Sequence, residues 1–368
     1  MSDGVKSFPL VPNPTKEILT DRQLVDYKHQ RERFLDWLKH FGKDPKKAEG
    51  YSEYTTKDTM YRTDRFWRWI WDYENKYTLS ISHEHADEYM KAIARKDCSN
   101  DNKATMYRAT KRLYKYRHVE HDEPEWEPDI KFSNTRMGQP QDFLTRQERR
   151  DIREAAMEYG SIPKYNDLAP DERDRWRTYL SQRLGKPKSR VKPEDWNRVN
   201  SWKIPSIVWT SLDAGFRPVE VKRAKLSWVD LRNERLSIPE EDSSKNRDNW
   251  KLPLTGRTVD ALKCWIDERQ QYNKYDGEDH LWLTKKGNPY SSGSLRYLMQ
   301  RLFEVAEIPA ENRRVSWYII RHSTGTYMAR EEGLEAARQQ LRHQSPETTM
   351  RYDQAPEKER RDALDRMG

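Results

Sequence analysis

Two arginines, a histidine and a tyrosine in the C-terminal half of the sequence could together carry out phosphoryl transfer. They are Arg217, Arg321, His343 and Tyr352. A tyrosine hydroxyl is a nucleophile that can form a covalent intermediate. Arginine suits a clamp on the non-bridging oxygens of a phosphate, because its planar guanidinium binds phosphate in a bidentate manner and stays charged. With one lysine as the acid for the leaving oxygen, these residues would form a complete set that needs no metal ion.

The spacing of these residues is as informative as their types. Arg217 lies in a glycine-containing turn after an apolar segment, at Gly215–Glu220 (GFRPVE). Arg321 lies near the start of a segment of apolar and then small residues, Tyr318–Thr326. His343 lies 22 residues after Arg321 (343 − 321), and Tyr352 lies nine residues after His343 (352 − 343). Each residue alone is better explained as a surface or packing residue, so the hypothesis depends on the ordered set.

In this order and at these distances, the residues resemble the tyrosine recombinases, or phage-type integrases. Catalytic domains of that family carry a Gly-x-Arg-x-x-Glu box, a lysine in a β-hairpin, a His-x-x-Arg box, a Gly-His pair, and a nucleophilic tyrosine nine residues after that histidine. The resemblance covers most of the chain. Members of the family usually have a helical DNA-clamping domain, then a linker, then the catalytic domain, and the same order is expected here. The segment Thr20–Leu24 looks most similar to archaeal integrases, or those of archaeal viruses.

The resemblance implies a role for each matching position. Arg217 and Arg321 would clamp the scissile phosphate, and Tyr352 would attack it to leave a 3′-phosphotyrosine. His343 would assist proton transfer or phosphate binding.

Three further residues would complete the site. Lys245 lies eight residues before Pro253 (253 − 245) in the expected hairpin and would be the acid that protonates the leaving 5′ oxygen. Lys251 in the same hairpin makes this assignment less secure. Glu220 would support an arginine of the clamp, and His322, which follows Arg321, would support the catalytic set.

Two positions depart from the family pattern. Tyr318 stands at the first position of the His-x-x-Arg box, and Arg342 stands in place of the glycine of the Gly-His pair. A tyrosine hydroxyl can still donate a hydrogen bond to a phosphate oxygen, but it is neutral near pH 7 because its reference pKa is about 10. We therefore include Tyr318 in the catalytic set, with a packed aromatic side chain that shapes the pocket as the alternative.

Composition agrees with a polyanionic partner and argues against other classes of site. The 69 basic and 61 acidic residues give a net charge of +8, which favours a nucleic-acid partner only modestly. Cys98 and Cys264 are too few and too far apart for a disulfide framework or a cysteine-rich zinc site. The segments His83–His85 and His118–His121 lack a recognised metal-site spacing, and no Walker-type glycine loop is present. We expect no metal and no cofactor.

The sequence also lacks signals for membrane insertion or export. No apolar run approaches the ~18 residues that a membrane span requires. Met1–Pro14 has no apolar signal core. We expect a cytoplasmic protein that associates with DNA and not with a membrane.

Four helices are expected in the N-terminal part, at about 21–41, 56–73, from Ser82 onward, and 102–118. Along the fourth, apolar residues at helical spacing can face a core. Its remaining surface is crowded with basic residues, which we predict to contact DNA phosphates: Lys103, Arg108, Lys111, Arg112 and Lys115. A solvated basic face is the alternative.

The elements that must position the catalytic set follow a proline-containing linker. An apolar helix is expected around Ile204–Leu212, then a β-hairpin at 235–239 and 250–254, and helices at 259–272, 294–306 and 318–332. The very polar stretch 161–200 is interpreted as an insertion.

Together these expectations describe a mainly α protein with a small antiparallel β-sheet. The expected divisions are a flexible N-terminus (1–15), a four-helix DNA-clamping domain (16–118), a linker (119–142) and a catalytic domain (143–368). The resemblance implies a metal- and ATP-independent recombinase that acts as a homo-tetramer on duplex DNA at specific attachment sites. The alternatives are a type IB topoisomerase with the same chemistry, or a catalytically silent DNA-binding protein of the same fold.

Overall fold

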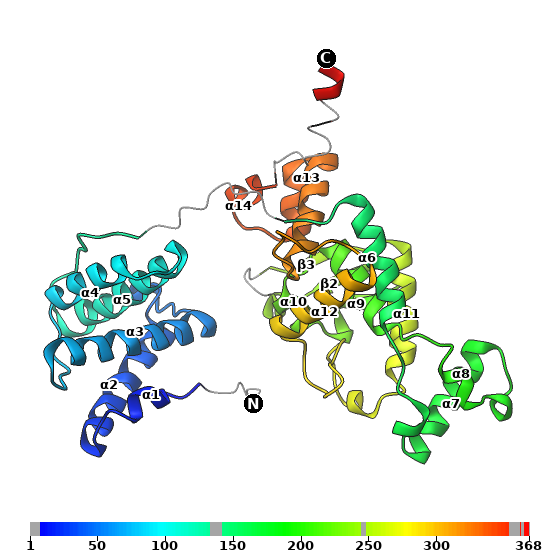
Figure 1. The fold of residues 1–368 in the computed structure, drawn as a ribbon, viewed down its shortest axis with the longest axis horizontal. Coiled ribbons are helices and arrows are strands. Elements are labelled where there is room, and N and C mark those ends of the chain that lie inside the picture. Colours follow the sequence, from blue (N-terminus) through cyan, green and yellow to red (C-terminus); the bar gives the residue numbers. More distant parts are fainter. Residues whose placement is uncertain (1–7, 133–141, 244–247, 353–360, 362–363, 368) are drawn as a thin grey trace. The chain divides into compact units, whose positions relative to one another are not determined.

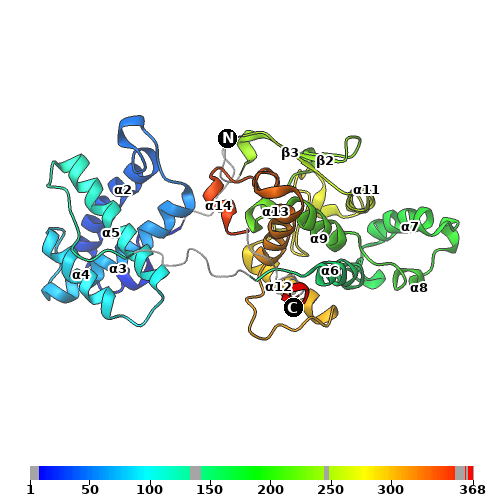
Figure 2. The same cartoon turned by 90° about the horizontal axis from the view of Figure 1, so that it is seen from above.

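The computed structural model describes residues 8–132, 142–243, 248–352, 361 and 364–367. The chain divides into two compact units, 1–137 and 138–368 (Figures 1 and 2). Both units are mainly helical, and the second contains a three-stranded antiparallel sheet, which confirms the predicted fold class. Within the described ranges, no helix is both long enough and apolar enough to cross a lipid bilayer.

Four long helices and one short one build the described part of the N-terminal unit. Their bounds are α1 Asn13–Lys16, α2 Asp21–His40, α3 Glu53–Glu74, α4 His83–Arg95 and α5 Asn100–His121. A side-chain oxygen just before each long helix accepts a backbone N–H of its first turn; the residues are Thr20, Ser52, Ser82 and Ser99. These caps satisfy donors that the helix itself leaves without partners. Helix α5 starts two residues before the predicted position and ends three residues after it.

A buried polar network ties the first three helices together. Asp64 of α3 lies 3.9 Å from the guanidinium of Arg31 and accepts hydrogen bonds from Tyr27 at 3.0 Å and Thr15 at 2.8 Å. Thr15 belongs to α1, and the other two partners belong to α2. Aromatic rings such as Trp67 fill the core around this network. The many Trp and Tyr residues therefore supply the core of an otherwise very polar sequence.

Seven helices form the body of the second unit in its described part. They are α6 Arg146–Tyr159, α9 Lys203–Ala214, α10 Pro218–Arg223, α11 Gly256–Arg269, α12 Ser292–Val305, α13 Tyr318–Leu341 and α14 Pro346–Met350. Helix α9 is the predicted apolar helix, and it packs against α6, α11 and α13. Helix α13 extends past its predicted end at 332, with a break in helical geometry at Gly333.

A small sheet lies beside these helices. Its strands β1 Val229–Asp230, β2 Arg235–Ile238 and β3 Trp250–Pro253 are antiparallel in this order. Strands β2 and β3 form the predicted hairpin, in which Leu236 pairs with Leu252 and both side chains enter the core. Strand β1 was not predicted, because two residues cannot show the alternation that marks a strand.

The polar stretch 161–200 forms a folded extension with a core of its own. It contains α7 Pro170–Leu184 and α8 Pro193–Trp196, whose buried side chains include Trp176 and Leu180. Both views place α7 and α8 together, away from α13 and α14 (Figures 1 and 2). At the junction with the body, the buried carboxylate of Glu268 accepts hydrogen bonds from the Ser201 hydroxyl at 2.6 Å and the Trp202 backbone N–H at 2.8 Å.

Candidate active site

The turn after α9 places Arg217 at the start of α10. Gly215 has a φ of +59°, a conformation that residues with side chains rarely adopt. A Cβ atom on Gly215 would also lie 2.5 Å from Cδ2 of Leu341, so α13 can approach the turn only because no side chain is present. Arg217 is the N-cap of α10, and Glu220 accepts its backbone N–H at 2.6 Å. The Gly-x-Arg-x-x-Glu spacing thus corresponds to a tight turn followed by a capped helix.

Glu220 is the centre of a buried charge cluster. Its carboxylate accepts hydrogen bonds from Nη1 of Arg217 at 3.0 Å and from Nε and Nη2 of Arg342 at 3.1 and 2.8 Å. Nη1 of Arg321 lies 3.8 Å away, and none of the four residues is more than 8% exposed. Burial alone would raise the pKa of Glu220, but the charges of the three arginines outweigh it and hold the pKa at about 2. The cluster therefore combines three cations with one anion at neutral pH.

This surplus of positive charge favours a bound anion. Burial and the neighbouring Arg217 lower the pKa of Arg321 to about 9, the direction expected for cations crowded together away from water. The Arg321 guanidinium donates hydrogen bonds to the backbone oxygens of Gly215, at 2.6 Å, and Leu341. These bonds hold the side chain between the α9–α10 turn and the end of α13. A phosphate group would supply negative charge in a form that guanidinium groups bind well.

Tyr352 lies at the same place, just after α14. Its side chain is 3% exposed and packs against Gly325 of α13, where a Cβ atom would come within 2.8 Å of ring atom Cε1. The Tyr352 hydroxyl forms a 3.2 Å hydrogen bond with Nδ1 of His322. Burial raises the pKa of Tyr352, and the charge of Arg321 partly offsets that effect. The predicted nucleophile therefore lies next to a predicted clamp arginine.

The ring of His343 lies parallel to that of Tyr352, with 5.9 Å between centroids and 9° between planes. Its Nδ1 forms a 2.8 Å hydrogen bond with the Thr349 hydroxyl. Burial and the charge of Arg321 lower the pKa of His343 to about 3, so the ring is neutral at pH 7. The residues that the structure brings together are Arg217, Glu220, Arg321, His322, His343 and Tyr352.

The region that contains this cluster matches a known family. Residues 201–359 match the phage integrase family. The matched stretch is less than half of the chain. The match includes every residue predicted to be catalytic from the sequence, and it does not include the N-terminal unit.

Individual relatives match part of the chain in sequence, and solved structures are similar to it in fold. Tyrosine recombinases XerC from two strains of Neisseria meningitidis serogroup C are each 32% identical over 111 residues, which is 30% of this chain and 34% of theirs. The chain thus spans about a third of the length of the curated relatives it matches. A XerH site-specific recombinase bound to palindromic difH substrate is similar in fold, with a TM-score of 0.56, 15% identity, and coverage of 96% of this chain and 90% of that one. A lambda integrase dimer bound to a COC′ core site gives a TM-score of 0.50, 12% identity, and coverage of 87% and 94%.

Arg342 stands where the integrase pattern has a glycine, and its backbone conformation and contacts explain how an arginine fits at this position. The residue has φ 56° and ψ 52°, the left-handed conformation in which glycine is favoured. An arginine there is disfavoured by roughly 1–2 kcal/mol. In return its guanidinium pairs with Glu220 and donates 2.8 Å hydrogen bonds to the backbone oxygens of Ala214 and Gln340. In the sequence Arg342 stands out only as a departure from the family pattern, although a cation in place of a glycine is itself a signal of an added ion pair.

Tyr318, the other departure, is the first residue of α13 and is 44% exposed. Its ring lies against His322, with 6.0 Å between centroids and 29° between planes. Tyr318 is therefore beside the cluster, on its solvent side, and its role in catalysis stays a prediction. Lys245 lies outside the described residues, in the sequence that joins β2 to β3. Its assignment as the acid also stays a prediction.

The predicted DNA-contacting residues of α5 fall into two groups. Arg108 and Lys111 are exposed. Lys103, Arg112 and Lys115 are partly buried, and each donates a hydrogen bond within the N-terminal unit, at 2.8 to 3.1 Å. The two exposed side chains can turn toward a phosphate with the smallest change, although Arg108 also donates a hydrogen bond to the Thr105 hydroxyl at 3.2 Å. The other three would have to give up or share a hydrogen bond with a more distant part of the unit.

We expect the double substitution Arg108→Gln with Lys111→Gln to weaken binding to all duplex DNA sequences. Each lost phosphate contact should also flatten the dependence of log affinity on log salt by up to about 0.9. Fluorescence anisotropy over a salt series measures both effects. Lys28→Gln with Lys47→Gln is a matched control, because these lysines are exposed in the same unit and pair with carboxylates. An unchanged salt slope in the Arg108/Lys111 variant would indicate a solvated face.

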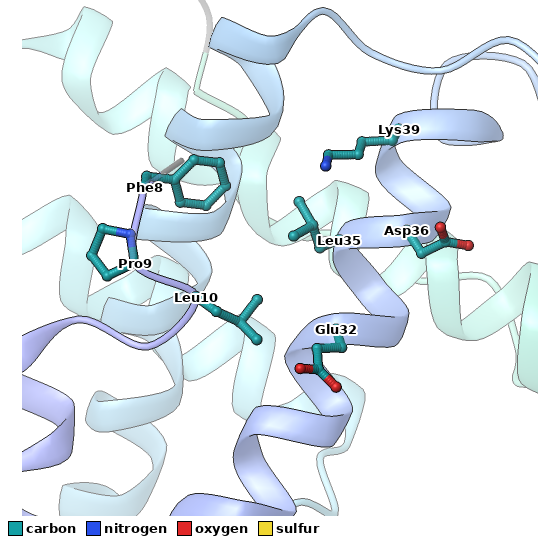
Figure 3. Close-up of a pocket in the computed structure, with 7 residues that line it drawn as sticks. All are labelled: Phe8, Pro9, Leu10, Glu32, Leu35, Asp36 and Lys39. Carbon is teal, nitrogen blue, oxygen red and sulfur yellow. The ribbon is translucent and has the colours of Figure 1, made fainter. Parts of the chain in front are cut away.

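A hollow in the N-terminal unit lies elsewhere in the chain and contains none of the predicted site residues. Residues 8–10 and the α2 side chains Glu32, Leu35, Asp36 and Lys39 line it (Figure 3). Its two carboxylates make it a poor site for a phosphate.

Proposed function

We propose that this protein is a site-specific DNA recombinase or integrase that cuts and rejoins duplex DNA through a 3′-phosphotyrosyl bond to Tyr352. The observation that carries the proposal is the position of the buried Tyr352 hydroxyl beside Arg321, in a cluster of three arginines and one carboxylate. The match of the same residues to the phage integrase family supports it.

The geometry suggests how the reaction would proceed. Arg217 and Arg321 bind the non-bridging oxygens and act most strongly in the pentacoordinate transition state, where the charge on those oxygens is greatest. The Tyr352 oxygen bonds to phosphorus, and the bond from phosphorus to the 5′ oxygen breaks. Lys245 protonates that oxygen, as the family resemblance implies, and the neutral His343 assists at the phosphate. A 5′ hydroxyl from a partner strand then attacks the phosphotyrosine and reseals the DNA, without nucleotide hydrolysis because the phosphotyrosyl bond retains the energy of the phosphodiester.

For the assembly, we infer that four copies of the chain act on two duplex attachment sites. An exchange between two sites requires two strand cuts in each duplex, hence one nucleophile for each of four cuts. The similar lambda integrase structure is a dimer on a core site, which is half of such an assembly. We further infer an archaeal or archaeal-virus type from the segment Thr20–Leu24, and action on DNA in the cytoplasm.

The function is tested by trapping a covalent DNA adduct. Fragments of the DNA that flanks the gene are incubated with the protein, and adducts that survive denaturant are isolated and sequenced to locate the cut. A nicked duplex with that site should then accumulate protein joined to a 3′ phosphate, and two intact sites should exchange strands. Relaxation of one supercoiled duplex without exchange would indicate a topoisomerase, and binding without an adduct would indicate a catalytically silent DNA-binding protein.

Tyr318→Phe should slow cleavage of the nicked duplex roughly 10- to 1000-fold if the hydroxyl donates a hydrogen bond in the transition state. DNA affinity should be nearly unchanged, and Tyr318→His should retain more activity than Tyr318→Phe. Single-turnover cleavage rates measure this, with Tyr297→Phe as the control because Tyr297 is another exposed tyrosine of the same unit. Cleavage by Tyr318→Phe at the unaltered rate would mean that the ring only packs against His322.

A further inference from the structure

His322 is placed at the atom of Tyr352 that must lose a proton. It follows Arg321 in α13, is 8% exposed, and its Nδ1 lies 3.2 Å from the Tyr352 hydroxyl. Tyr318 lies against the His322 ring, and the Tyr352 ring lies 5.8 Å from it between centroids. The imidazole is therefore fixed at the hydroxyl rather than free in solvent.

The neighbouring groups are less suited to accept that proton. Arg321 lies near the hydroxyl, but a charged guanidinium has no lone pair to offer. His343 is parallel to the Tyr352 ring, and its Nδ1 is already bonded to Thr349. Within the described part of the chain, His322 is the group beside the Tyr352 hydroxyl that can both bond to it and gain a proton.

The charges around His322 keep it ready to act as a base. Burial and the positive charges of Arg351 and Arg321 lower the pKa of His322 to about 4, while Asp142 acts in the opposite direction. A pKa below neutrality means that the ring is uncharged at pH 7 and can accept a proton. The groups that face it come from α13 (Arg321 and Tyr318), from the end of α14 (Arg351 and Tyr352), and from the segment before α6 (Asp142). A bound phosphate would add negative charge and raise the pKa again, toward the range in which a base works best near neutral pH.

We propose that His322 is the general base that takes the proton of Tyr352 as its oxygen attacks the scissile phosphorus. This inference rests on the proposed function. In the cleavage step the tyrosine O–H bond breaks, an N–H bond forms at Nδ1, the tyrosine oxygen bonds to phosphorus, and the 5′ oxygen leaves with a proton from the general acid. Rejoining reverses each transfer: the attacking 5′ hydroxyl returns its proton to the acid, and the departing Tyr352 oxygen recovers its own from His322.

Two substitutions separate a base from a residue that only holds the tyrosine in position. His322→Ala removes the ring. His322→Asn keeps a hydrogen-bond acceptor near the position of Nδ1 but cannot hold the proton. Both should slow single-turnover cleavage of the nicked duplex by roughly 10²- to 10⁴-fold, with DNA affinity retained. His280→Asn is the matched control, because His280 is a partly exposed histidine of the same unit, outside the cluster around Tyr352.

Two chemical rescues test the direction of the proton transfer. A fluorinated tyrosine at position 352 has a more acidic phenol and should restore much of the rate lost in His322→Asn. A substrate with sulfur in place of the bridging 5′ oxygen has a leaving group that needs no acid, so it should rescue Lys245→Ala but not His322→Asn. The acid limb of the rate–pH profile should also disappear in His322→Asn.

The outcomes distinguish this inference from the proposed function. If the unaltered protein forms the adduct and His322→Asn cleaves at the same rate, His322 only positions Tyr352 and the inference is wrong while the function stands. Rescue of His322→Asn by the sulfur substrate would also overturn it, because the defect would then concern the leaving group. If the unaltered protein forms no adduct, the proposed function fails, and the role of His322 fails with it.

Discussion

Tyr352→Phe should abolish formation of the covalent DNA adduct while DNA binding stays intact. The substitution removes the attacking oxygen and keeps the ring that packs against Gly325 and lies parallel to His343. One hydrogen bond to His322 is lost, and a hydrogen bond of this kind contributes only about 1 kcal/mol to stability. The three arginines around Glu220 remain, so the phosphate site persists. The adduct is measured on the nicked duplex in denaturing gels, and the affinity by gel shift.

The control for this substitution is Tyr297→Phe, which removes a tyrosine hydroxyl at a 60% exposed position of the same unit. It should leave the adduct yield unchanged. An adduct of normal yield from Tyr352→Phe would mean that another side chain is the nucleophile. Loss of both DNA binding and adduct would instead indicate that the substitution disturbs the end of α14.

Much of the site was predictable because its residues are close in sequence to the turns that orient them. Gly215, Arg217 and Glu220 form one turn and one helix cap, so their spacing follows from backbone geometry. Arg321 and His322 share a helix turn with Gly325, whose lack of a side chain admits the ring of Tyr352. Spacing of this kind can be read without knowing the tertiary structure.

The parts that were missed depend on contacts between distant segments. The pairing of Arg342 with Glu220 joins residues 122 positions apart, and the sequence gives no sign of it beyond an unexpected cation. The hydrogen bond of His322 to Tyr352 spans 30 positions. The core of 161–200 forms from scattered residues such as Trp176 and Trp196, so its polar composition alone could not reveal a folded extension.

Glu220→Ala should have the largest effect on the stability of the second unit. It leaves the guanidinium groups of Arg217, Arg321 and Arg342 buried around an empty position, and removal of one partner from a buried ion pair typically costs about 3–5 kcal/mol. Both clamp arginines would lose an anchor, so cleavage should fall below detection. Hydrogen exchange of peptides from α10 and α13 measures the loss of stability in this part of the second unit. Unfolding of the whole chain would not separate it from the stability of the N-terminal unit.

Protonation of Glu220 should also lower the stability of the second unit in acid. The pKa of Glu220, about 2, lies below the ordinary glutamate value of 4.5, so the ionised form is favoured in the folded state. The stabilisation is fully present above about pH 4.5 and is lost as the pH falls toward 2; a depression of this size corresponds to about 3 kcal/mol. Glu335→Gln is the control, because the pKa of Glu335 is also about 2 but its side chain is exposed, where water and salt screen its pairing with Arg338. Equal protection of α10 and α13 at pH 3 and pH 7 would contradict the prediction.

A double-mutant cycle shows whether Glu220 acts through charge. Glu220→Gln keeps an acceptor for the Arg217 backbone N–H but leaves three buried cations without their anion. Arg342→Gly removes one of these cations and also relieves the left-handed strain at that position. The double variant should therefore be clearly more stable than the sum of the two single effects predicts, because each substitution alone unbalances the charge that the other restores. It should also retain more cleavage activity than Glu220→Gln, since Arg217 and Arg321 would again form a compact pair with room for one phosphate. Additive losses would mean that the three arginines are held by their backbone hydrogen bonds and that the charge of Glu220 is secondary.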